Sequence, residues 1–210
     1  MKKLKKLALV LATDFEAKPF IKGFSLKKIE DGPFLIYGIN EIYLIISGIG
    51  KVNSSIAASY LIVEHGITHL FNLGACGSTN REYGVGDILH INRVLDYDRP
   101  KLLNMKPRFI KPHIITGFRT AGLSTQDRPV IGGDDRKKIG QYAELVDMEG
   151  AGFLQACKVF SKKSYLFKIV TDTPEHQKNL DIIMNIKRTA PVMYKFFKDE
   201  VFRKFNNGDM

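Results

Sequence analysis

Two carboxylates stand where short apolar runs end. Asp172 lies between two threonines after the apolar residues 169–170, and Glu149 follows the segment Val-Asp-Met at 146–148. An aspartate that is partly removed from water has a raised pKa, so Asp172 could act as a general acid near neutral pH. A carboxylate at Glu149 could accept hydrogen bonds from sugar hydroxyls. Each also has a structural interpretation, because Thr171 or Asp172 could cap a helix and Glu149 could be a first-turn carboxylate.

Two glycine-containing segments follow other apolar runs. Residues 47–51 read Ser-Gly-Ile-Gly-Lys, and residues 72–78 read Asn-Leu-Gly-Ala-Cys-Gly-Ser. At such strand ends, backbone N–H groups can approach an anion or a polar ligand, and open α/β sheets bind ligands beyond the carboxyl ends of their strands. Residues 47–51 match neither the phosphate-binding P-loop nor a dinucleotide fingerprint. A tight turn or close backbone packing is the alternative for these segments.

The elements that would position these residues are expected to form an α/β fold, because short apolar runs alternate with helical patterns. We predict one domain over residues 1–210. Strands are predicted at 7–12, 34–39, 42–47, 70–73, 87–94 and 165–170, with a hairpin over 34–47 and a turn at 74–77. Residues 111–116 could be a further strand, and three prolines indicate a loop at 98–112. Helices are predicted at 52–65, ended by Gly66, at 149–160, and at 179–205, interrupted by Pro191.

The composition is that of a globular protein. Hydrophobic residues make up 44% and charged residues 26% of the chain, enough for a core that needs no disulfide. Cys76 and Cys157 are predicted to be buried free thiols in a reducing compartment. The start of the chain resembles a signal peptide, but its apolar run is only about six residues long, is followed by Asp14 and has no small-residue cleavage site. We therefore expect a cytoplasmic protein with no membrane span.

The net charge of +10 raises the question of a nucleic-acid partner. The lysines are scattered along the chain, however, and no basic and aromatic RNA-binding signature accompanies them. A basic surface is the simpler explanation, and we expect no nucleic-acid partner.

Several of these segments, in this order, resemble the 5′-methylthioadenosine/S-adenosylhomocysteine nucleosidases and their phosphorylase relatives. They are residues 47–51, 66–78 and 84–88, the segment 146–152, which is similar to that family's Val-Glu-Met-Glu, and Thr171-Asp172, which is similar to its Ser-Asp pair. The resemblance spans about residues 7–175 and is weakest at 98–145. It implies an α/β/α sandwich with a mixed central sheet, and a homodimer or higher oligomer in which a neighbouring subunit can complete the site.

The resemblance also implies roles for individual residues. Asp172 would bind or protonate the purine at N7, and Met148 and Glu149 would hold the ribose, with Glu149 taking its 2′- and 3′-hydroxyls. Asp14 falls at the position of the acid that activates water, and Glu16, two residues on, is also available. That family usually has a stacking aromatic residue near 121–130, and this chain has none between residues 118 and 142. The other binding candidates are Gly48, Gly50, Gly74, Ala75, Gly77, Gln126, Arg128 and Thr171.

Water or phosphate could be the nucleophile in this superfamily. The hexameric phosphorylases carry an arginine and a serine where this chain has Asn72 and Ala75. Phosphate is best bound by arginine forks and hydroxyls, so these differences predict water. Residues 12–19 look more like futalosine hydrolases, which tend to have asparagine where Asp172 stands because their base is hypoxanthine. Asp172 therefore favours an adenine.

We therefore expect a purine nucleoside N-glycosidase that needs no metal or organic cofactor. Its substrate would be an adenine nucleoside such as 5′-methylthioadenosine or S-adenosylhomocysteine, or a futalosine-type nucleoside. The alternative within enzymes is a phosphate-dependent purine nucleoside phosphorylase. The alternative outside enzymes is a member that binds a nucleoside or a partner protein without turnover.

Overall fold

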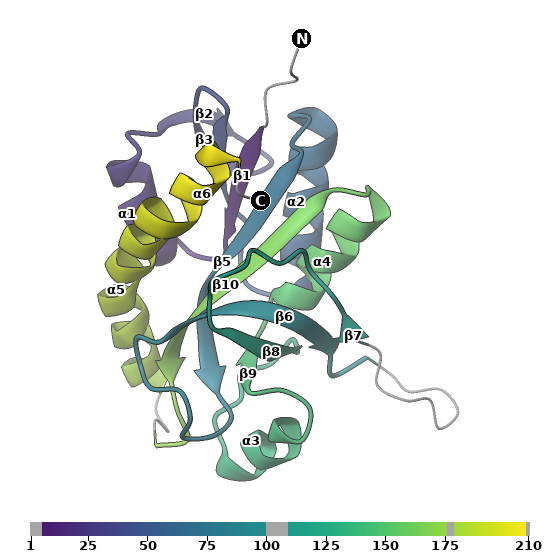
Figure 1. The fold of residues 1–210 in the computed structure, drawn as a ribbon, viewed down its shortest axis with the longest axis vertical. Helices are drawn as coiled ribbons and strands as arrows, with labels where there is room; N and C mark the ends of the chain where they lie inside the picture. Colours follow the sequence, from purple (N-terminus) through teal and green to yellow (C-terminus); the bar gives the residue numbers. More distant parts are fainter. Residues whose placement is uncertain (1–5, 100–108, 176–178, 209–210) are drawn as a thin grey trace.

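A ten-stranded mixed sheet forms the centre of the molecule (Figure 1). The computed structural model describes residues 6–99, 109–175 and 179–208. The strand order is β10-β6-β8-β9-β5-β1-β4-β3-β2, with β7 beside β6. The strands are β1 Leu7–Leu11, β2 Lys27–Asp31, β3 Leu35–Ile39, β4 Ile42–Ile46, β5 His69–Ser78, β6 Ile88–Asp96, β7 Phe109–Ile110, β8 Thr120–Thr125, β9 Leu145–Asp147 and β10 Lys163–Asp172.

The sheet combines parallel and antiparallel pairs. Strand β1 lies between β4 and β5 and is parallel to both, and β5 is parallel to β10. The pairs β6–β8 and β8–β9 are also parallel, whereas β6–β10, β5–β9, β3–β4 and β2–β3 are antiparallel. Because β10 pairs with both β5 and β6, the strands β5, β10, β6, β8 and β9 close on themselves. The predicted mixed sheet is confirmed. Its partial closure was not predicted from the sequence.

Helices cover both faces of the sheet, which confirms the predicted α/β/α sandwich. Helices α2 and α4 pack against one face, and α1, α5 and α6 lie on the other (Figure 1). Helix α3 lies apart from both layers, near the end of β9. The helices are α1 Asp14–Gly23, α2 Lys51–Glu64, α3 Gly133–Gly140, α4 Gly150–Val159, α5 Asn179–Phe196, the π-helical segment η1 Phe197–Phe202 and α6 Arg203–Asn207.

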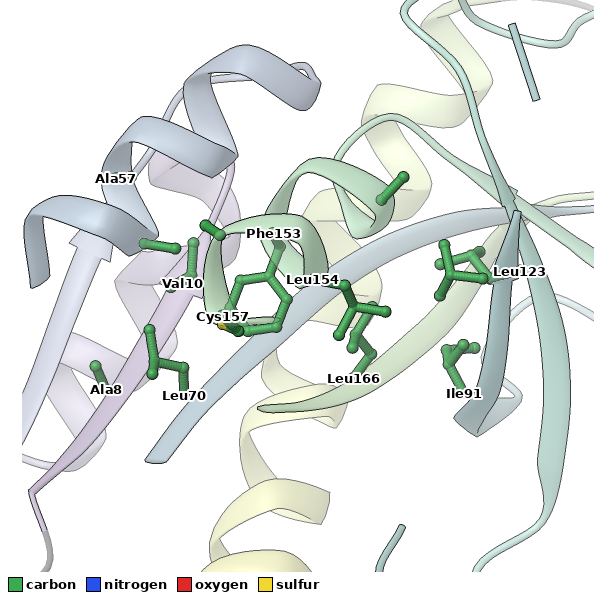
Figure 2. Close-up of a cluster of buried hydrophobic side chains, with 14 of the residues drawn as sticks. Ala8, Val10, Ala57, Leu70, Ile91, Leu123, Phe153, Leu154, Cys157 and Leu166 are labelled. Atoms are coloured by element: carbon green, nitrogen blue, oxygen red, sulfur yellow. The ribbon is translucent and has the colours of Figure 1, made fainter. Parts of the chain in front are cut away.

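The core between the sheet and the α2–α4 layer is tightly packed. Phe153 and Leu154 of α4 lie over strand residues such as Val10 and Leu166, all at most 2% exposed (Figure 2). Each such side chain contributes roughly 1.5–3 kcal/mol when it leaves water. Helices α2 and α4 also approach closely, because a Cβ at Gly152 would lie 2.1 Å from the Lys51 carbonyl oxygen. This packing fixes the start of α4, where Glu149 stands.

Most predicted elements are confirmed, and three predictions are wrong. Residues 74–77 are not a turn, because β5 continues to Ser78 by pairing with β10 and β9. Residues 111–116 form no strand. Helix α5 is not interrupted at Pro191, since buried neighbours such as Met193 and Phe197 hold it against the sheet, and a wider π-helical turn follows at η1. The predicted loop at 98–112 falls mostly outside the described residues, and in its described part residues 109–110 form the short strand β7 beside β6.

Elements that are short or lack a clear apolar period were missed from the sequence. They are α1, β2, β7, β8, α3 and β9. Both cysteines are free and buried, as predicted. In the described part of the chain, no helix combines the length and the apolar character that crossing a membrane requires.

Candidate active site

A cavity opens at the carboxyl ends of the parallel strands β1, β5 and β10, the edge where α/β sheets bind ligands. It holds about 680 Å³ of empty space, counting its open side, which is within the range of small-molecule sites. Its walls come from segments far apart in the sequence. They are Ala12, Thr13, Glu16, Ile49, Ala75, Cys76, Gly77, Arg128, Pro129, Val130, Val146, Asp147, Met148, Glu149, Thr171, Asp172, Ile182 and Ile186.

Glu16 reaches this cavity from the first turn of α1. Thr13 and Glu16 form a capping box: Glu16 Oε2 accepts hydrogen bonds from the Thr13 N–H at 3.0 Å and from its hydroxyl at 2.8 Å. Glu16 Oε1 accepts one from the Ala75 N–H at 2.9 Å. Gly74, with φ +152°, permits this approach, because a Cβ there would lie 2.6 Å from Oε1. Asp14 is exposed and does not line the cavity.

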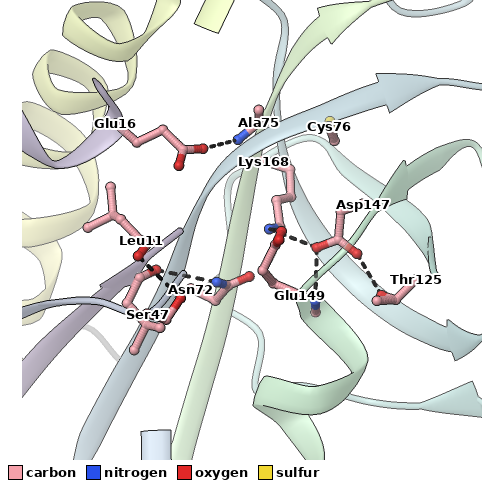
Figure 3. A network of polar contacts seen from close by, with 12 residues as sticks. Leu11, Glu16, Ser47, Asn72, Ala75, Cys76, Thr125, Asp147, Glu149 and Lys168 are labelled. Carbon is pink, nitrogen blue, oxygen red and sulfur yellow. Dashed lines mark hydrogen bonds and ion pairs between the residues drawn. The ribbon is translucent and has the colours of Figure 1, made fainter. Parts of the chain in front are cut away.

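Glu149 stands above a buried charge network (Figure 3). The Lys168 ammonium lies 2.8 Å from Asp147 Oδ2 and 4.0 Å from Glu149 Oε2, and its side chain is 1% exposed. Asp147 also accepts hydrogen bonds from the Thr125 hydroxyl at 2.6 Å and from a backbone N–H of α4 at 2.9 Å. Glu149 Oε1 accepts one from the Gly50 N–H at 3.1 Å. The network holds Glu149 at the cavity wall.

The electrostatics of this network are dominated by burial. Removal from water raises the pKa of Glu149 to about 7; Lys168 opposes that rise, and Asp147 and Glu16 add to it. Burial by itself would lower the pKa of Lys168, but Asp147 and Glu149 outweigh it and leave that pKa raised. Lys168 is therefore a charged ammonium beneath the cavity, and Glu149 changes its charge near neutral pH.

Asp172 and Thr171 line the same cavity from the end of β10. The Thr171 hydroxyl donates to Asp172 Oδ1 at 3.1 Å, and Arg136 of α3 donates to Asp172 Oδ2. Arg136 also donates to the Ser78 carbonyl oxygen at 2.5 Å and is 1% exposed. Neither Arg136 nor Lys168 was among the residues singled out in the sequence. A charged residue inside the apolar run of β10 was the available signal for Lys168.

The glycine loop before α2 does not present an open anion site. Gly50, with φ +106°, directs its N–H to Glu149, and the Lys51 N–H donates to Asp127 at 2.9 Å. The Lys51 ammonium contacts three carboxylates. These are Asp96 at 2.8 Å, Asp98, and Asp127 at 3.6 Å. The loop therefore holds the protein's own carboxylates.

The cavity gathers most of the residues singled out from the sequence. Glu16, Ala75, Gly77, Arg128, Met148, Glu149, Thr171 and Asp172 line it. Asp14, Gly48, Gly50, Gly74 and Gln126 do not. Gln126 is 3% exposed, and its side-chain amide donates to the Arg128 carbonyl oxygen at 2.9 Å, so it shapes the loop above the cavity. No aromatic side chain of the described residues lines the cavity; Arg128, Pro129 and Val130 stand there instead.

Comparisons with known proteins agree with this architecture. The family model of the phosphorylase superfamily matches residues 6–116. The chain is 28% identical to a 5′-methylthioadenosine/S-adenosylhomocysteine nucleosidase of Staphylococcus epidermidis, over 63% of this chain and 68% of that protein. It is 23% identical to an aminodeoxyfutalosine nucleosidase of Campylobacter jejuni, over 91% of this chain and 96% of that one.

A similar fold occurs among solved structures. A futalosine hydrolase mutant of Helicobacter pylori superposes with a TM-score of 0.86 at 18% identity, covering 95% of this chain and all of that one. The 5′-methylthioadenosine nucleosidase of Arabidopsis thaliana gives a TM-score of 0.85 at 20% identity, covering 99% of this chain and 98% of that one. At these identities the likeness concerns the fold.

Proposed function

This chain belongs to the phosphorylase superfamily, and we propose that it hydrolyses the N-glycosidic bond of a purine nucleoside. One observation carries the proposal: Glu16, Glu149 and Asp172, from three distant segments, line one cavity at the carboxyl ends of the central strands. Two carboxylates that hold a sugar and a water, opposite a third that meets the base, are the groups this reaction needs. The nucleosidase names of the relatives support the same activity.

In the proposed mechanism, the bond to the base breaks ahead of water attack, and positive charge develops on the ribose. Glu149 accepts hydrogen bonds from the 2′- and 3′-hydroxyls, beside Met148. When Glu149 is ionised, the buried carboxylates Glu16, Asp147 and Glu149 outnumber the ammonium of Lys168 that stands among them. This surplus of negative charge favours the cation-like transition state. Glu16, held by Thr13 and Ala75, orients the attacking water.

To act on N7 of the leaving purine, Asp172 must carry a proton: as a carboxylic acid it donates a hydrogen bond or that proton to N7, which makes the base a better leaving group. Its carboxyl group can accept a hydrogen bond from an exocyclic amino group, which supports an adenine nucleoside as substrate. No described residue supplies an aromatic ring to the cavity, and Arg128, Pro129 and Val130 would supply flat or apolar contacts to the base instead, since a guanidinium plane can stack on a ring.

Water is the proposed nucleophile because carboxylates engage Lys51 and Lys168, and because Asn72 stands where the phosphorylases carry an arginine. Lys51 is held by three carboxylates, and the Asn72 amide donates to the Val10 carbonyl oxygen at 3.3 Å. Arg128, which is exposed and lines the cavity, is the one observation that favours the phosphorylase as second candidate. We further propose a homo-oligomer that works in the cytoplasm, where two buried free thiols remain reduced.

The test is product analysis after incubation with a panel of purine nucleosides, with and without inorganic phosphate. We expect free base together with ribose or a 5-substituted ribose in phosphate-free buffer, and no ribose 1-phosphate when phosphate is added. Ribose 1-phosphate formed in proportion to phosphate would replace hydrolysis by phosphorolysis. Tight binding of a purine nucleoside with no released base under either condition would favour the non-catalytic alternative.

A further inference from the structure

Arg136 joins the surface helix α3 to the base end of the cavity. Helix α3 is eight residues long, and only Arg136 and Ile139 of it are buried. The Arg136 side chain is 1% exposed and reaches the ends of β5 and β10, where one guanidinium nitrogen donates to Asp172 Oδ2 and another to the Ser78 carbonyl oxygen at 2.5 Å. The guanidinium thus bridges a backbone atom and a cavity carboxylate.

The backbone is shaped around this pair. A Cβ at Gly77 would lie 2.6 Å from Asp172 Oδ2 and 3.0 Å from Arg136 Nη1, so the pair requires the bare backbone of a glycine at this position. Asp172 and Gly77 line the cavity, and Arg136 does not. The guanidinium therefore contacts Asp172 from behind and takes Oδ2, while Oδ1, which accepts from the Thr171 hydroxyl at 3.1 Å, is the other oxygen of the group.

Stability alone is a poor explanation for this arrangement. Taking a guanidinium and a carboxylate out of water carries a desolvation penalty that their attraction often only balances, and apolar side chains of similar volume can replace such pairs without loss. The Arg136 Nε–H is buried and has no hydrogen-bond partner, which adds to the penalty. What the arginine supplies is geometry: one nitrogen of its planar guanidinium is anchored on the Ser78 carbonyl oxygen, and this directs the other nitrogen at Asp172 Oδ2.

We propose that Arg136 is the positioning residue for Asp172: it holds Oδ2 from behind the cavity wall and so sets how the carboxyl group faces the purine. This inference rests on the proposed function in assigning the base to Asp172. The direction of the Asp172 carboxyl group then depends on α3. A shift of about 1 Å in a reacting group can lower a rate about 100-fold, so loss of the fork has a kinetic consequence.

A double-mutant cycle tests the proposal. Arg136→Gln is expected to lower kcat/KM for base release about 10–100-fold. In the Asp172→Asn background the same change is expected to lower kcat/KM less than about 2-fold further, because a positioning residue acts only through the group it positions. Arg136→Lys, which keeps the charge but lacks the fork, should fall between wild type and Arg136→Gln.

Arg93→Gln is the matched control, since Arg93 pairs with Glu144 at 3.1 Å outside the cavity. It should retain wild-type kinetics. Circular dichroism melting of every variant reports on the fold, and if Arg136→Gln does not fold, the comparison of Arg136→Lys in the two backgrounds decides. Losses that multiply in the double variant, or an Arg136 variant with wild-type kinetics, would overturn the inference.

Calorimetric titration with adenine separates this inference from the proposed function. A wild-type protein that binds adenine but releases base from no nucleoside would refute the proposed function. The double-mutant cycle would then use the affinity for adenine as its readout. The inference still requires Arg136→Gln to weaken adenine binding in the wild-type background and to have no further effect in the Asp172→Asn background. Equal weakening in both backgrounds would overturn it.

Discussion

At the scale of single residues, Asp172 has the main catalytic role in the proposed mechanism, because it acts on the leaving base. Asp172→Asn keeps the volume and one acceptor oxygen while it removes the charge, so the fold should persist, with a lower melting temperature because the buried Arg136 loses its counter-ion. We expect base release to fall by about 10²–10⁴-fold, the usual range for a positioned acid. Steady-state rates beside a circular dichroism melt measure both effects. A folded variant with full activity would remove Asp172 from the mechanism.

Glu149 offers a test through pH. Burial raises its pKa to about 7, so the side chain is mostly neutral at pH 6 and mostly ionised at pH 8. An ionised carboxylate accepts two hydroxyl hydrogen bonds better than a neutral carboxyl group, so kcat/KM for ribosides should rise through about pH 7. The folded protein holds the Glu149 proton more tightly than the unfolded chain does. The resulting contribution to the free energy of unfolding is fully present below pH 4.5 and is lost as the pH rises through about 7.

Glu149→Gln should abolish that rise and reduce riboside turnover far more than it reduces binding of free adenine, which has no hydroxyls to lose. The pH profile of kcat/KM and a titration with adenine give the two readings. If kcat/KM of the Glu149→Gln variant still rose through about pH 7, the group that titrates there would not be Glu149. Equal losses for the riboside and for adenine would contradict the sugar-binding role.

At the scale of elements, strand β5 decides where the carboxylates lie. Its residues Gly74 and Gly77 bring the backbone against Glu16 and Asp172, where any Cβ would lie 2.6 Å from a carboxylate oxygen. Gly74→Ala would also have to adopt φ +152°, a conformation that costs about 1–3 kcal/mol for residues other than glycine.

We therefore expect Gly74→Ala to lower both the melting temperature and the rate of base release, because Glu16 must move away from Ala75. Gly84→Ala is the control, since no atom lies within 4 Å of a Cβ there. Melting curves and initial rates for both variants test the effect. If Gly74→Ala melted lower but kept the wild-type rate, the position of Glu16 would be irrelevant to turnover.

Apolar periodicity explains which elements the sequence could predict. Strand β1 and helices α2 and α4 carry continuous or one-sided apolar patterns, whereas α3 has Ile139 as its single large apolar residue and β9 has three residues. The capping box of Thr13 and Glu16 was a local signal for the start of α1, and it would have favoured Glu16 over Asp14. Arg136 gave no such signal, because its partner Asp172 is 36 residues away and only tertiary packing joins them.

At the scale of the whole molecule, the two helical layers differ in what they leave exposed. Val52, Ile56 and Val63 lie on one face of α2 and are 67%, 52% and 60% exposed. Ile49, just before this helix, is 54% exposed and also lines the cavity, so the apolar face continues to the open side of the site. Contiguous exposed apolar surface of this kind indicates an interaction site.

A second copy of the chain is the occupant we expect on this face of α2, because it would cover the exposed side chains and close the cavity near Ile49 at once. Sedimentation velocity should show a dimer at micromolar concentration. The double change Val52→Asp and Ile56→Asp should give a folded monomer with reduced kcat/KM, since both side chains are more than half exposed and their replacement leaves the core intact. Val192→Asp on α5, where Val192 is 49% exposed in the opposite layer, should leave both the dimer and its activity intact. A wild-type chain that sediments as a monomer at every concentration, with full activity, would refute this arrangement and leave the cavity complete within one subunit.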